Sequence, residues 1–379
     1  MRILQIVNGL DIGSKSGGAA QFALELSAYL HDRGEEVHVA ALYRFHTSEE
    51  QYWENQIRRA GMDVIYLNSN QRLNLLRTIG TLRNECVIRH IELLHTHTPV
   101  GSLAGIFIKW GTPYLKMVRT EHTPIPWGTS LLGNISRFLF TNLLFPICID
   151  MEVGVSPPIT DMLNRRAGVK WSHRSAIWIP PVLPDMYRRR LDDPYKAEPA
   201  DGQYVIGSVG SLRKIKGYDD LLRAIALVRE IYPAIKLMLV GDGEERRTLE
   251  ELSNKLGLRN QVQFMGARYD VPDLLGMMDL FVLPSFIEGL PTTILESWAI
   301  GTPVIGSDIP GIRAILTDGQ EGWLVMAGDF HALAQKIITV LANLQERNQV
   351  RANGRQAVMA YTMEKVGSAY QDLYANGLP

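Results

Sequence analysis

The sequence alternates short apolar runs, rich in β-branched residues, with longer amphipathic stretches along almost its whole length. Such short runs predict buried strands, and the stretches between them repeat apolar residues with the period of a helix. Strands that alternate with helices form parallel sheets covered by helices on both faces. The expected strands span residues 3–7, 37–41, 64–67, 115–119, 152–155, 176–179, 205–209, 236–240, 262–265, 280–283, 303–306 and 323–325. The clearest expected helices span residues 20–33, 219–231, 244–256, 292–300 and 363–374.

One segment breaks this alternation. Between residues 180 and 202 the chain carries five prolines and a run of three arginines, a composition typical of a connection between domains. The 379 residues also exceed the roughly 150 residues of an ordinary domain. We therefore expect two doubly wound α/β domains, residues 1–183 and residues 200–361. Ligands of such sheets bind at the carboxyl ends of the strands, so the cleft between the domains is the expected site.

Composition excludes several classes of protein. Hydrophobic residues make up 46% of the chain and charged residues 21%, which is typical of globular proteins and unlike disordered or fibrous chains. Two cysteines exclude a disulfide framework and favour a reducing, cytoplasmic compartment. The net charge of −1 gives no sign of nucleic-acid binding.

The small net charge conceals an uneven distribution. Residues 51–190 carry 17 basic and 9 acidic side chains, net +8. The same region contains an apolar stretch, residues 138–149, preceded by the segment 126–132, which holds Trp127, Leu131 and Leu132. The stretch is shorter than the roughly 20 apolar residues that span a bilayer. It predicts either a buried helix with its entry loop or, together with the basic charge, a peripheral contact with an anionic membrane at its inner face.

The segment from residue 283 to residue 296 carries the most chemical information. A strand ends in it, a loop with a glycine follows, and Pro291 suits the first helical position, where a missing N–H costs nothing. The N–H groups of Thr292 and Thr293 would then be unpaired at the helix start. Such a start attracts an anion through aligned donors and the helix dipole. The segment therefore predicts a phosphate site.

Two carboxylates flank this predicted phosphate site. Glu288 precedes the helix and Glu296 lies within it. If the whole stretch were helical, eight residues would separate them by roughly 12 Å, which is wider than the pair in a typical glycosidase. That separation suits the two ends of an elongated ligand with a phosphate group in its middle. The alternative interpretation is a helix cap and an unrelated surface glutamate.

Glu288 and Glu296 match the E-x7-E motif of retaining glycosyltransferases, and residues 207–325 resemble glycosyltransferase family 4. The resemblance is carried by residues 209–217, 239–243, 283–285, 301–305 and 322–325, and more loosely by residues 17–20, 25–26 and 33–34. It implies the GT-B fold, in which two Rossmann-like domains face each other across a cleft. It also implies that a last helix, at about residues 362–379, returns to the first domain.

The resemblance further implies that the second domain binds a nucleotide-diphosphate sugar, for which we expect a UDP-sugar. Glu296 would hold the ribose hydroxyls, Glu288 would hold the transferred sugar, and Lys216 would neutralise the diphosphate as it leaves. Ser211 stands where the family usually has arginine, and Arg213 either reaches the same phosphate or is a solvated loop cation. The other expected donor contacts come from Gly210, Gly241, Arg268, Gly289, Leu290, Pro291, Thr292 and Thr293.

In the first domain the same resemblance points to two glycines and a histidine. Gly17 and Gly18 would let the backbone approach the diphosphate, although a flexible turn is the alternative. His122 would face the reacting sugar as a catalytic residue, and His97 and Glu121 would line the acceptor side. The alternative for His122 is a hydrogen-bonded structural role.

A metal site is the interpretation to reject for the pair formed by His95 and His97. We expect both to follow a strand, and alternate residues of a strand share a face. No set of Cys, Asp or Glu accompanies them in the sequence. We therefore expect no metal, and no cofactor apart from the donor substrate itself.

Together these observations predict a retaining, metal-independent glycosyltransferase. It would move a sugar from a UDP-sugar to a hydroxyl of a glycan or lipid-linked acceptor, in the synthesis of a cell-surface polysaccharide or glycolipid. Two other functions are compatible with the sequence. A nucleotide-sugar epimerase with the GT-B fold would use the donor without an acceptor, and a non-catalytic protein would bind a nucleotide or carbohydrate without turnover.

Overall fold

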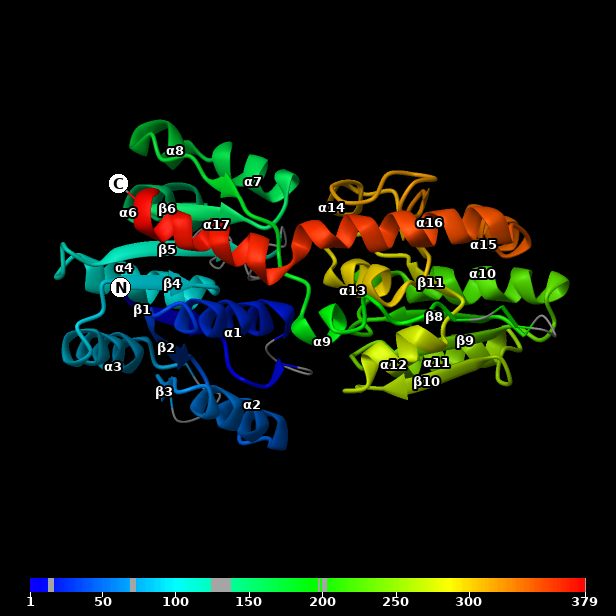
Figure 1. Ribbon diagram of the computed structural model, residues 1–379, viewed down its shortest axis with the longest axis horizontal. Coiled ribbons are helices and arrows are strands. Elements are labelled where there is room, and N and C mark those ends of the chain that lie inside the picture. The colour runs from blue at the N-terminus through cyan, green and yellow to red at the C-terminus, as the bar shows by residue number, and fades with distance from the viewer. Residues whose placement is uncertain (13–16, 69–72, 124–137, 197, 200–202, 379) are drawn as a thin grey trace. The chain divides into compact units, whose positions relative to one another are not determined.

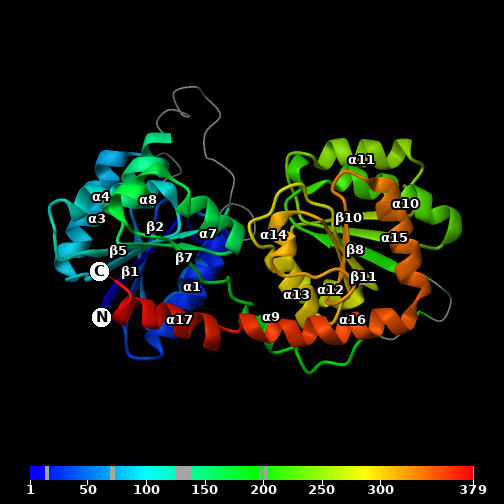
Figure 2. The same cartoon turned by 90° about the horizontal axis from the view of Figure 1, so that it is seen from above.

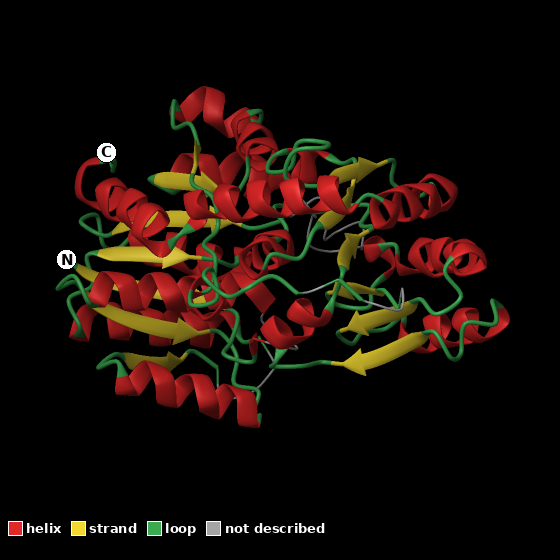
Figure 3. Cartoon of the chain, turned by 45° about the vertical axis from the view of Figure 1, so that its right-hand side comes forward, coloured by secondary structure: helices red, strands yellow, loops and turns green. Residues whose placement is uncertain are grey.

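Two compact units make up the protein. The computed structural model describes residues 1–12, 17–68, 73–123, 138–196, 198–199 and 203–378 (Figure 1). The first unit comprises Met1–Val182 and Met363–Pro379, and the second comprises Leu183–Thr362. Each unit contains one parallel sheet with helices packed against it, as Figures 2 and 3 show.

The first unit is built on a seven-stranded parallel sheet, in which the strands lie in the order β3-β2-β1-β4-β5-β6-β7. The strands are β1 (Arg2–Val7), β2 (Glu36–Ala41), β3 (Asp63–Tyr66), β4 (Leu93–Thr96), β5 (Lys116–Glu121), β6 (Met151–Gly154) and β7 (Ile177–Trp178). The helices are α1 (Gly17–His31), α2 (Ser48–Arg59), α3 (Leu75–Ile88), α4 (Pro99–Lys109), the π-helix η2 (Phe140–Leu144), α6 (Phe145–Cys148), α7 (Pro157–Asn164), α8 (Ala167–Ser172) and α17 (Met363–Asn376).

The two faces of this sheet bury different helices. Side chains alternate along a strand, so Ile3 and Val7 of β1 pack in one core with α1 and α17. Leu4 and Ile6 point to the other face and pack with α3, α4 and α6. Both faces are therefore apolar, which explains why β1 is an almost continuous hydrophobic run. Tyr370 of α17, from the end of the chain, is fully buried in the first of these cores.

The second unit has a six-stranded parallel sheet, in which the strands lie in the order β10-β9-β8-β11-β12-β13. The strands are β8 (Val205–Val209), β9 (Lys236–Val240), β10 (Val262–Gly266), β11 (Leu280–Leu283), β12 (Val304–Ser307) and β13 (Trp323–Val325). The helices are α9 (Asp185–Arg188), the 3₁₀-helix η3 (Lys214–Lys216), α10 (Tyr218–Ile231), α11 (Arg246–Lys255), α12 (Val271–Met277), α13 (Thr292–Ile300), α14 (Pro310–Arg313), α15 (Phe330–Ala342), α16 (Leu344–Ala357) and the 3₁₀-helix η4 (Val358–Tyr361).

The segment expected to connect two domains is part of the second unit. Its one-turn helix α9 packs against α13. Further along, the guanidinium of Arg355 from α16 lies 4.2 Å from the centre of the Tyr195 ring. Arg347, also from α16, donates to Glu198 at 2.7 Å. The prolines interrupt periodicity and so indicate a linker, but these contacts with α16 are long-range and leave no local pattern in the sequence.

The expected strands lie within two residues of the observed ones, with one strand missing from the expected set. That strand is β4, whose four residues include His95. The prediction that His95 follows a strand is wrong, because His95 lies inside β4 and is fully buried. A histidine in a four-residue run weakens the apolar signal on which strand prediction depends.

The apolar stretch at residues 138–149 is helical but only partly buried. Phe145 is fully buried, whereas Phe138, Leu139 and Ile147 are exposed. Residues 126–132, which precede this stretch in the sequence and were grouped with it above, lie outside the described part of the chain. Among the described residues, no helix has both the length and the apolar character needed to cross a membrane.

Candidate functional site

A glycine holds the turn after β8 against the loop after β11. Gly217 has a φ of +66°, and a Cβ on it would lie 2.2 Å from the carbonyl oxygen of Pro284. Next to this contact, the N–H of Phe286 donates to the carbonyl of Ile215 at 2.8 Å. Only glycine fits such a position without a steric penalty. The close approach fixes η3, and with it Lys216, beside the loop that carries Glu288.

Lys216 and Glu288 form an ion pair at this junction. The Nζ atom of Lys216 lies 2.6 Å from Oε1 of Glu288, and the two side chains are 19% and 11% exposed. The hydroxyl of Ser285, which is fully buried, donates to the same Oε1 atom at 2.7 Å. Because the pair is largely removed from water, its charges are screened less than those of a surface pair. The sequence analysis singles out Lys216 and Glu288 but misses Ser285.

The helix start expected to bind an anion is present, but Pro291 is its N-cap and not its first helical residue. Pro291 is the N-cap of α13, with no side chain capping the turn, and the N–H of Ile294 donates to the carbonyl of Pro291. The first helical positions are therefore Thr292 and Thr293, whose N–H groups have no intrahelical acceptor. The carbonyl of Glu288 is 2.2 Å from where a Cβ on Gly311 would lie, so α14 supports the loop closely.

Glu296 lies inside α13 and is buried. The hydroxyls of Tyr187 and Thr292 hydrogen-bond to its carboxylate. Burial raises the pKa of Glu296, although these hydrogen bonds act in the opposite direction. Burial and the neighbouring carboxylate also raise the pKa of Tyr187. Tyr187 belongs to the segment expected to be a linker, so the sequence offers no signal for this contact.

Gly210 and Gly241 bring the ends of β8 and β9 together. Gly241 has a φ of +133°, and a Cβ on it would lie 2.0 Å from the carbonyl oxygen of Gly210. The N–H of Gly210 donates to Val240, and the N–H of Gly241 donates to Gly266. These glycines therefore have a packing requirement, in addition to any contact with a ligand.

The other predicted donor contacts fall into an inner and an outer group. Leu290 is buried, and Gly289 lies beside it in the loop before α13. Ser211 and Arg213 are exposed on the turn after β8. Arg268 is exposed and donates to Asp270 at 2.7 Å.

In the first unit, the predicted histidine is part of a hydrogen-bonded chain. Nε2 of His122 lies 3.0 Å from Nδ1 of His97, and Nε2 of His97 lies 2.9 Å from Oε1 of Gln5. The ring of Phe22, from α1, contacts His122 edge-on with 5.5 Å between the ring centres. Burial, with a smaller contribution from Arg119, lowers the pKa of His122 to about 3. His122 is therefore a neutral imidazole at pH 7.

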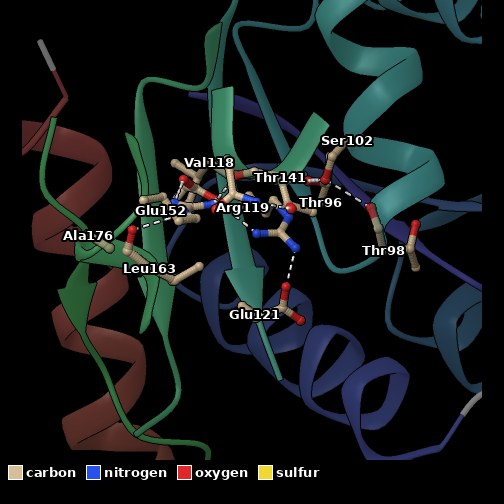
Figure 4. Close-up of polar contacts among 12 residues, drawn as sticks. Thr96, Thr98, Ser102, Val118, Arg119, Glu121, Thr141, Glu152, Leu163 and Ala176 are labelled. Atoms are coloured by element: carbon tan, nitrogen blue, oxygen red, sulfur yellow. Dashed lines mark hydrogen bonds and ion pairs between the residues drawn. The ribbon is translucent and has the colours of Figure 1, made fainter. Parts of the chain in front are cut away.

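A buried charge network joins β5 and β6 on the opposite face of the sheet, where Arg119 packs over Phe145 (Figure 4). Arg119, 2% exposed, pairs with Glu121 and with Glu152, and Glu152 also pairs with Arg166. Burial acts to lower the pKa of Arg119, but Glu121 and Glu152 raise it above its ordinary value. Glu121 is thus engaged by Arg119, and its predicted place on the acceptor side stays a prediction. Arg166 also donates to the carbonyl of Thr141 at 2.9 Å.

The two predicted glycines of the first unit are at the start of α1, where the helix begins at Gly17. Both Gly17 and Gly18 are exposed, and among the described residues a Cβ on either would meet no atom within 4 Å. The described residues thus leave room for a ligand next to them. In the described residues, no group of three or more His, Cys, Asp or Glu side chains is arranged to hold a metal ion.

Known families match both units. The family described as glycosyltransferase family 4 matches residues 16–180, and the family of glycosyl transferases group 1 matches residues 190–357. Between them these matches cover most of both units.

Individual proteins give the same picture. The lipopolysaccharide core biosynthesis glycosyltransferase LpsD of Rhizobium meliloti (strain 1021) is 28% identical over 385 residues, which cover 100% of this chain and 99% of LpsD. LpsE of the same strain, with the same description, is 34% identical over 190 residues, which cover 50% of this chain and only 53% of LpsE. The crystal structure of Anabaena Alr3699/HepE in complex with UDP-glucose has a TM-score of 0.80 at 20% identity, covering 99% of both chains. With its two parallel-sheet units, the chain therefore belongs to the glycosyltransferases of the family 4 type, which have the GT-B fold.

Proposed function

We propose that this protein transfers a sugar from a UDP-sugar to a hydroxyl of a glycan or lipid-linked acceptor, with retention of the anomeric configuration. The observation that carries the proposal is the Lys216–Glu288 ion pair, at 2.6 Å, next to the uncapped start of α13. A lysine and the N–H groups of a helix start lie here next to carboxylates. The lysine and the N–H groups suit the diphosphate of a nucleotide sugar, and the carboxylates suit its hydroxyl groups. The description of LpsD and the UDP-glucose complex of HepE support the choice of donor and acceptor class.

The donor would lie along α13. The diphosphate would bind the N–H groups of Thr292 and Thr293, where the helix dipole favours an anion. Glu296, already a hydrogen-bond acceptor for Tyr187, would accept the ribose hydroxyls. A buried carboxylate without its hydrogen bonds is costly, so a ribose that donates to it gains affinity.

Departure of the diphosphate would depend on fixed positive charge. Lys216 can exchange its bond to Glu288 for a phosphate oxygen, and the N–H groups of α13 add to it. With these groups in place, we propose that no metal ion is required. Glu288, released from Lys216, would bind the hydroxyls of the sugar, and the acceptor hydroxyl would attack from the face that the diphosphate leaves.

The first unit would bind the acceptor. His122, a neutral imidazole, would face the reacting sugar, and the open space beside Gly17 and Gly18 would admit the diphosphate. Exclusion of water from the closed site would protect the donor from hydrolysis.

We propose that the first unit also contacts an anionic membrane at its inner face. Four large apolar side chains are exposed, two of them by more than 60%: Phe107 of α4, Trp110 directly after it, Ile147 of α6 and Trp171 of α8. These helices are neighbours, since α6 packs against both α4 and α8. Lys170 is exposed beside Trp171. Aromatic rings with basic neighbours are typical of membrane-interface surfaces.

Flotation with vesicles tests this contact. We expect binding to vesicles that contain phosphatidylglycerol, weakening with salt, and loss of binding in the Trp110→Ser, Trp171→Ser double variant. Tyr52→Ser, which removes a ring that is 56% exposed from α2, is the control. Equal binding to neutral vesicles, or equal binding by the double variant and the control, would contradict the proposal.

The transferase proposal is tested by incubating the protein with UDP-sugars, with and without acceptor, in the presence of EDTA. We expect release of UDP that depends on the acceptor, and a product whose anomeric configuration, read by NMR, equals that of the donor. An isomerised donor in the absence of acceptor would indicate an epimerase. Tight UDP binding with no turnover on glycan and lipid-linked acceptors would indicate a non-catalytic binding protein.

A further inference from the structure

A line of buried polar side chains crosses one face of the first sheet. Gln5 of β1 is in register with His95 of β4, and Thr120 lies on the next strand, β5. His97 and His122 follow the ends of β4 and β5. Because side chains alternate along strands, these five residues all point to the face that α1 and α17 cover. Gln5 and His95 are both 0% exposed, so the positions of their protons are set by their neighbours and not by water.

The donor and acceptor of each hydrogen bond along this line can be assigned, beginning at α17. The hydroxyl of Tyr374 lies 2.6 Å from Nδ1 of His95, and Nε2 of His95 lies 2.8 Å from Oγ1 of Thr120. A phenol is a stronger acid than an imidazole N–H, so in this short contact Tyr374 donates and Nδ1 accepts. Burial holds the pKa of His95 well below its ordinary value, so the ring is neutral. Its single proton is then on Nε2 and is donated to Thr120.

The same tyrosine orients Gln5. The Tyr374 oxygen has given its proton to His95, so it attracts the amide nitrogen of Gln5 and not the amide oxygen, although no hydrogen bond of ordinary geometry forms between them. The amide nitrogen of Gln5 therefore faces Tyr374, and Oε1 faces Nε2 of His97 at 2.9 Å. An amide oxygen only accepts, so His97 carries its proton on Nε2. His97 is buried and neutral as well, which leaves its Nδ1 as an acceptor.

This line of hydrogen bonds ends at His122, the residue expected to face the sugar. Because Nδ1 of His97 accepts, the Nε2 atom of His122, 3.0 Å away, must be the donor. A neutral imidazole has one N–H, so Nδ1 of His122 carries a lone pair. The edge of the Phe22 ring limits rotation of His122.

We propose that Gln5 and His97 are positioning residues that hold His122 in the Nε2–H tautomer, so that its Nδ1 accepts a hydrogen bond from a hydroxyl of the donor sugar or the acceptor. The opposite tautomer would present an N–H at the same place and would orient that hydroxyl the other way round. This inference rests on the proposed transferase function for the role of His122. The tautomer itself is a property of the free protein.

The test reads the tautomer directly, by ¹⁵N NMR of the histidine rings in the full-length protein without substrate. In the wild type we expect a protonated Nε2 and an unprotonated Nδ1 for His122. In Gln5→Glu the carboxylate favours a doubly protonated His97, which then donates from Nδ1 and turns His122 into the Nδ1–H tautomer. Ser102→Ala is the matched control, because Ser102 is also fully buried next to β4 and bonds to Thr96 at 2.7 Å, away from the chain.

Kinetics supply the second readout. We expect Gln5→Glu to lower kcat by about 10²-fold, as for a misplaced catalytic contact, with the KM for the donor within about twofold, and Ser102→Ala to change neither. A wild-type His122 with its proton on Nδ1 would overturn the proposal, even if no variant of Gln5 folds. So would a Gln5→Glu protein with unchanged tautomer and kcat. A wild type that shows the expected tautomer but transfers no sugar would sink the proposed function and leave the tautomer assignment intact.

Discussion

The two units share an arrangement of strands but place their polar groups differently. In each sheet the first strand lies in the interior, with the next two strands on one side and the later strands on the other. The first unit buries Gln5 and His95 within its strands, under α1 and α17. The second buries only the small hydroxyls of Ser208 and Ser307 as polar side chains within its strands. It places Lys216 in η3 and Glu288 on a loop, where Gly217 makes a close backbone contact.

The difference suggests two ways of preparing a site. A buried chain of neutral hydrogen bonds fixes the direction of each donor, and it cannot rearrange without leaving a polar group unpaired. An ion pair on loops can open, because a phosphate oxygen can replace one partner. We infer that the first unit is built to orient a substrate, and the second to hold and release a charged one.

The largest effect on stability should come from the glycines that bring the ends of β8 and β9 together in the second unit. Gly241→Ala should destabilise this unit by about 4 kcal/mol or more, because its Cβ would lie 2.0 Å from the Gly210 carbonyl at a positive φ. Gly18→Ala should change stability by less than about 1 kcal/mol, because among the described residues a Cβ there meets no atom within 4 Å. Denaturant unfolding measures both, and equal effects would contradict the contrast between the units.

The next largest effect should be on turnover. Lys216→Ala should lower kcat by about 10² to 10³-fold, the usual consequence of removing a group that stabilises developing charge. Lys214→Ala, in the same 3₁₀-helix but exposed, should leave kcat nearly unchanged. Initial rates of UDP release give the comparison. Similar losses in the two variants would show that the turn, and not the ion pair with Glu288, is what matters.

Acid should change the stability contributions of buried groups in the two units in opposite directions. Burial lowers the pKa of His95 and His97, so below the unfolded value of about 6.5 the unfolded chain takes up protons that the folded unit does not. Their contribution to stability, present above about pH 6.5, is lost as the pH falls, by at most about 1.4 kcal/mol per pH unit for each ring. Glu296 has the opposite sign, because its pKa is raised and protonation in acid relieves the cost of its burial.

Hydrogen exchange with mass spectrometry, corrected for intrinsic rates, reports each unit separately. From pH 7 to pH 5.5 we expect protection to fall in β1, β4 and β5 more than in β8 and β11. A uniform change across both sheets would argue against the buried neutral histidines as its cause.

The smallest effect should come from the exposed arginines. The side chains of Arg268 and Asp270 are both 40% exposed, so their ion pair is screened by water and Arg268→Ala should leave stability nearly unchanged. If Arg268 contacts the donor base, the same variant should raise the donor KM by a few-fold and leave kcat unchanged. Titration of UDP by calorimetry would show whether Arg213→Ala has a similar effect.

The sequence predicts the strands and helices of the two units well, but it predicts poorly the contacts between segments that lie far apart in the chain. The strand from Leu280 to Leu283 and the helix from Thr292 to Ile300 have their expected bounds, because strong local signals lie at each end: an apolar run, a proline and a glycine. The predicted Lys216 and Glu288 do meet. The segments that carry them contain glycines, and these glycines give a local signal in the sequence.

The residues that sequence analysis misses act across long distances in the chain. Tyr187 reaches Glu296 from a segment that looks like a linker, and Tyr374 reaches His95 across 279 residues. Ser285 and Gln5 are ordinary polar residues whose importance comes only from what lies beside them. No periodicity encodes such contacts, since they depend on how the strands are ordered in the sheet.

The most direct test of the central claim separates the two glutamates of α13 and its loop. UDP affinity by calorimetry and acceptor-dependent transfer are measured on wild type, Glu288→Gln and Glu296→Gln, with folding checked by thermal unfolding. We predict that Glu288→Gln binds UDP about as well as wild type but loses transfer by about 10²-fold or more, while Glu296→Gln loses affinity for UDP. Transfer at a near-wild-type rate by a folded Glu288→Gln protein would contradict the account.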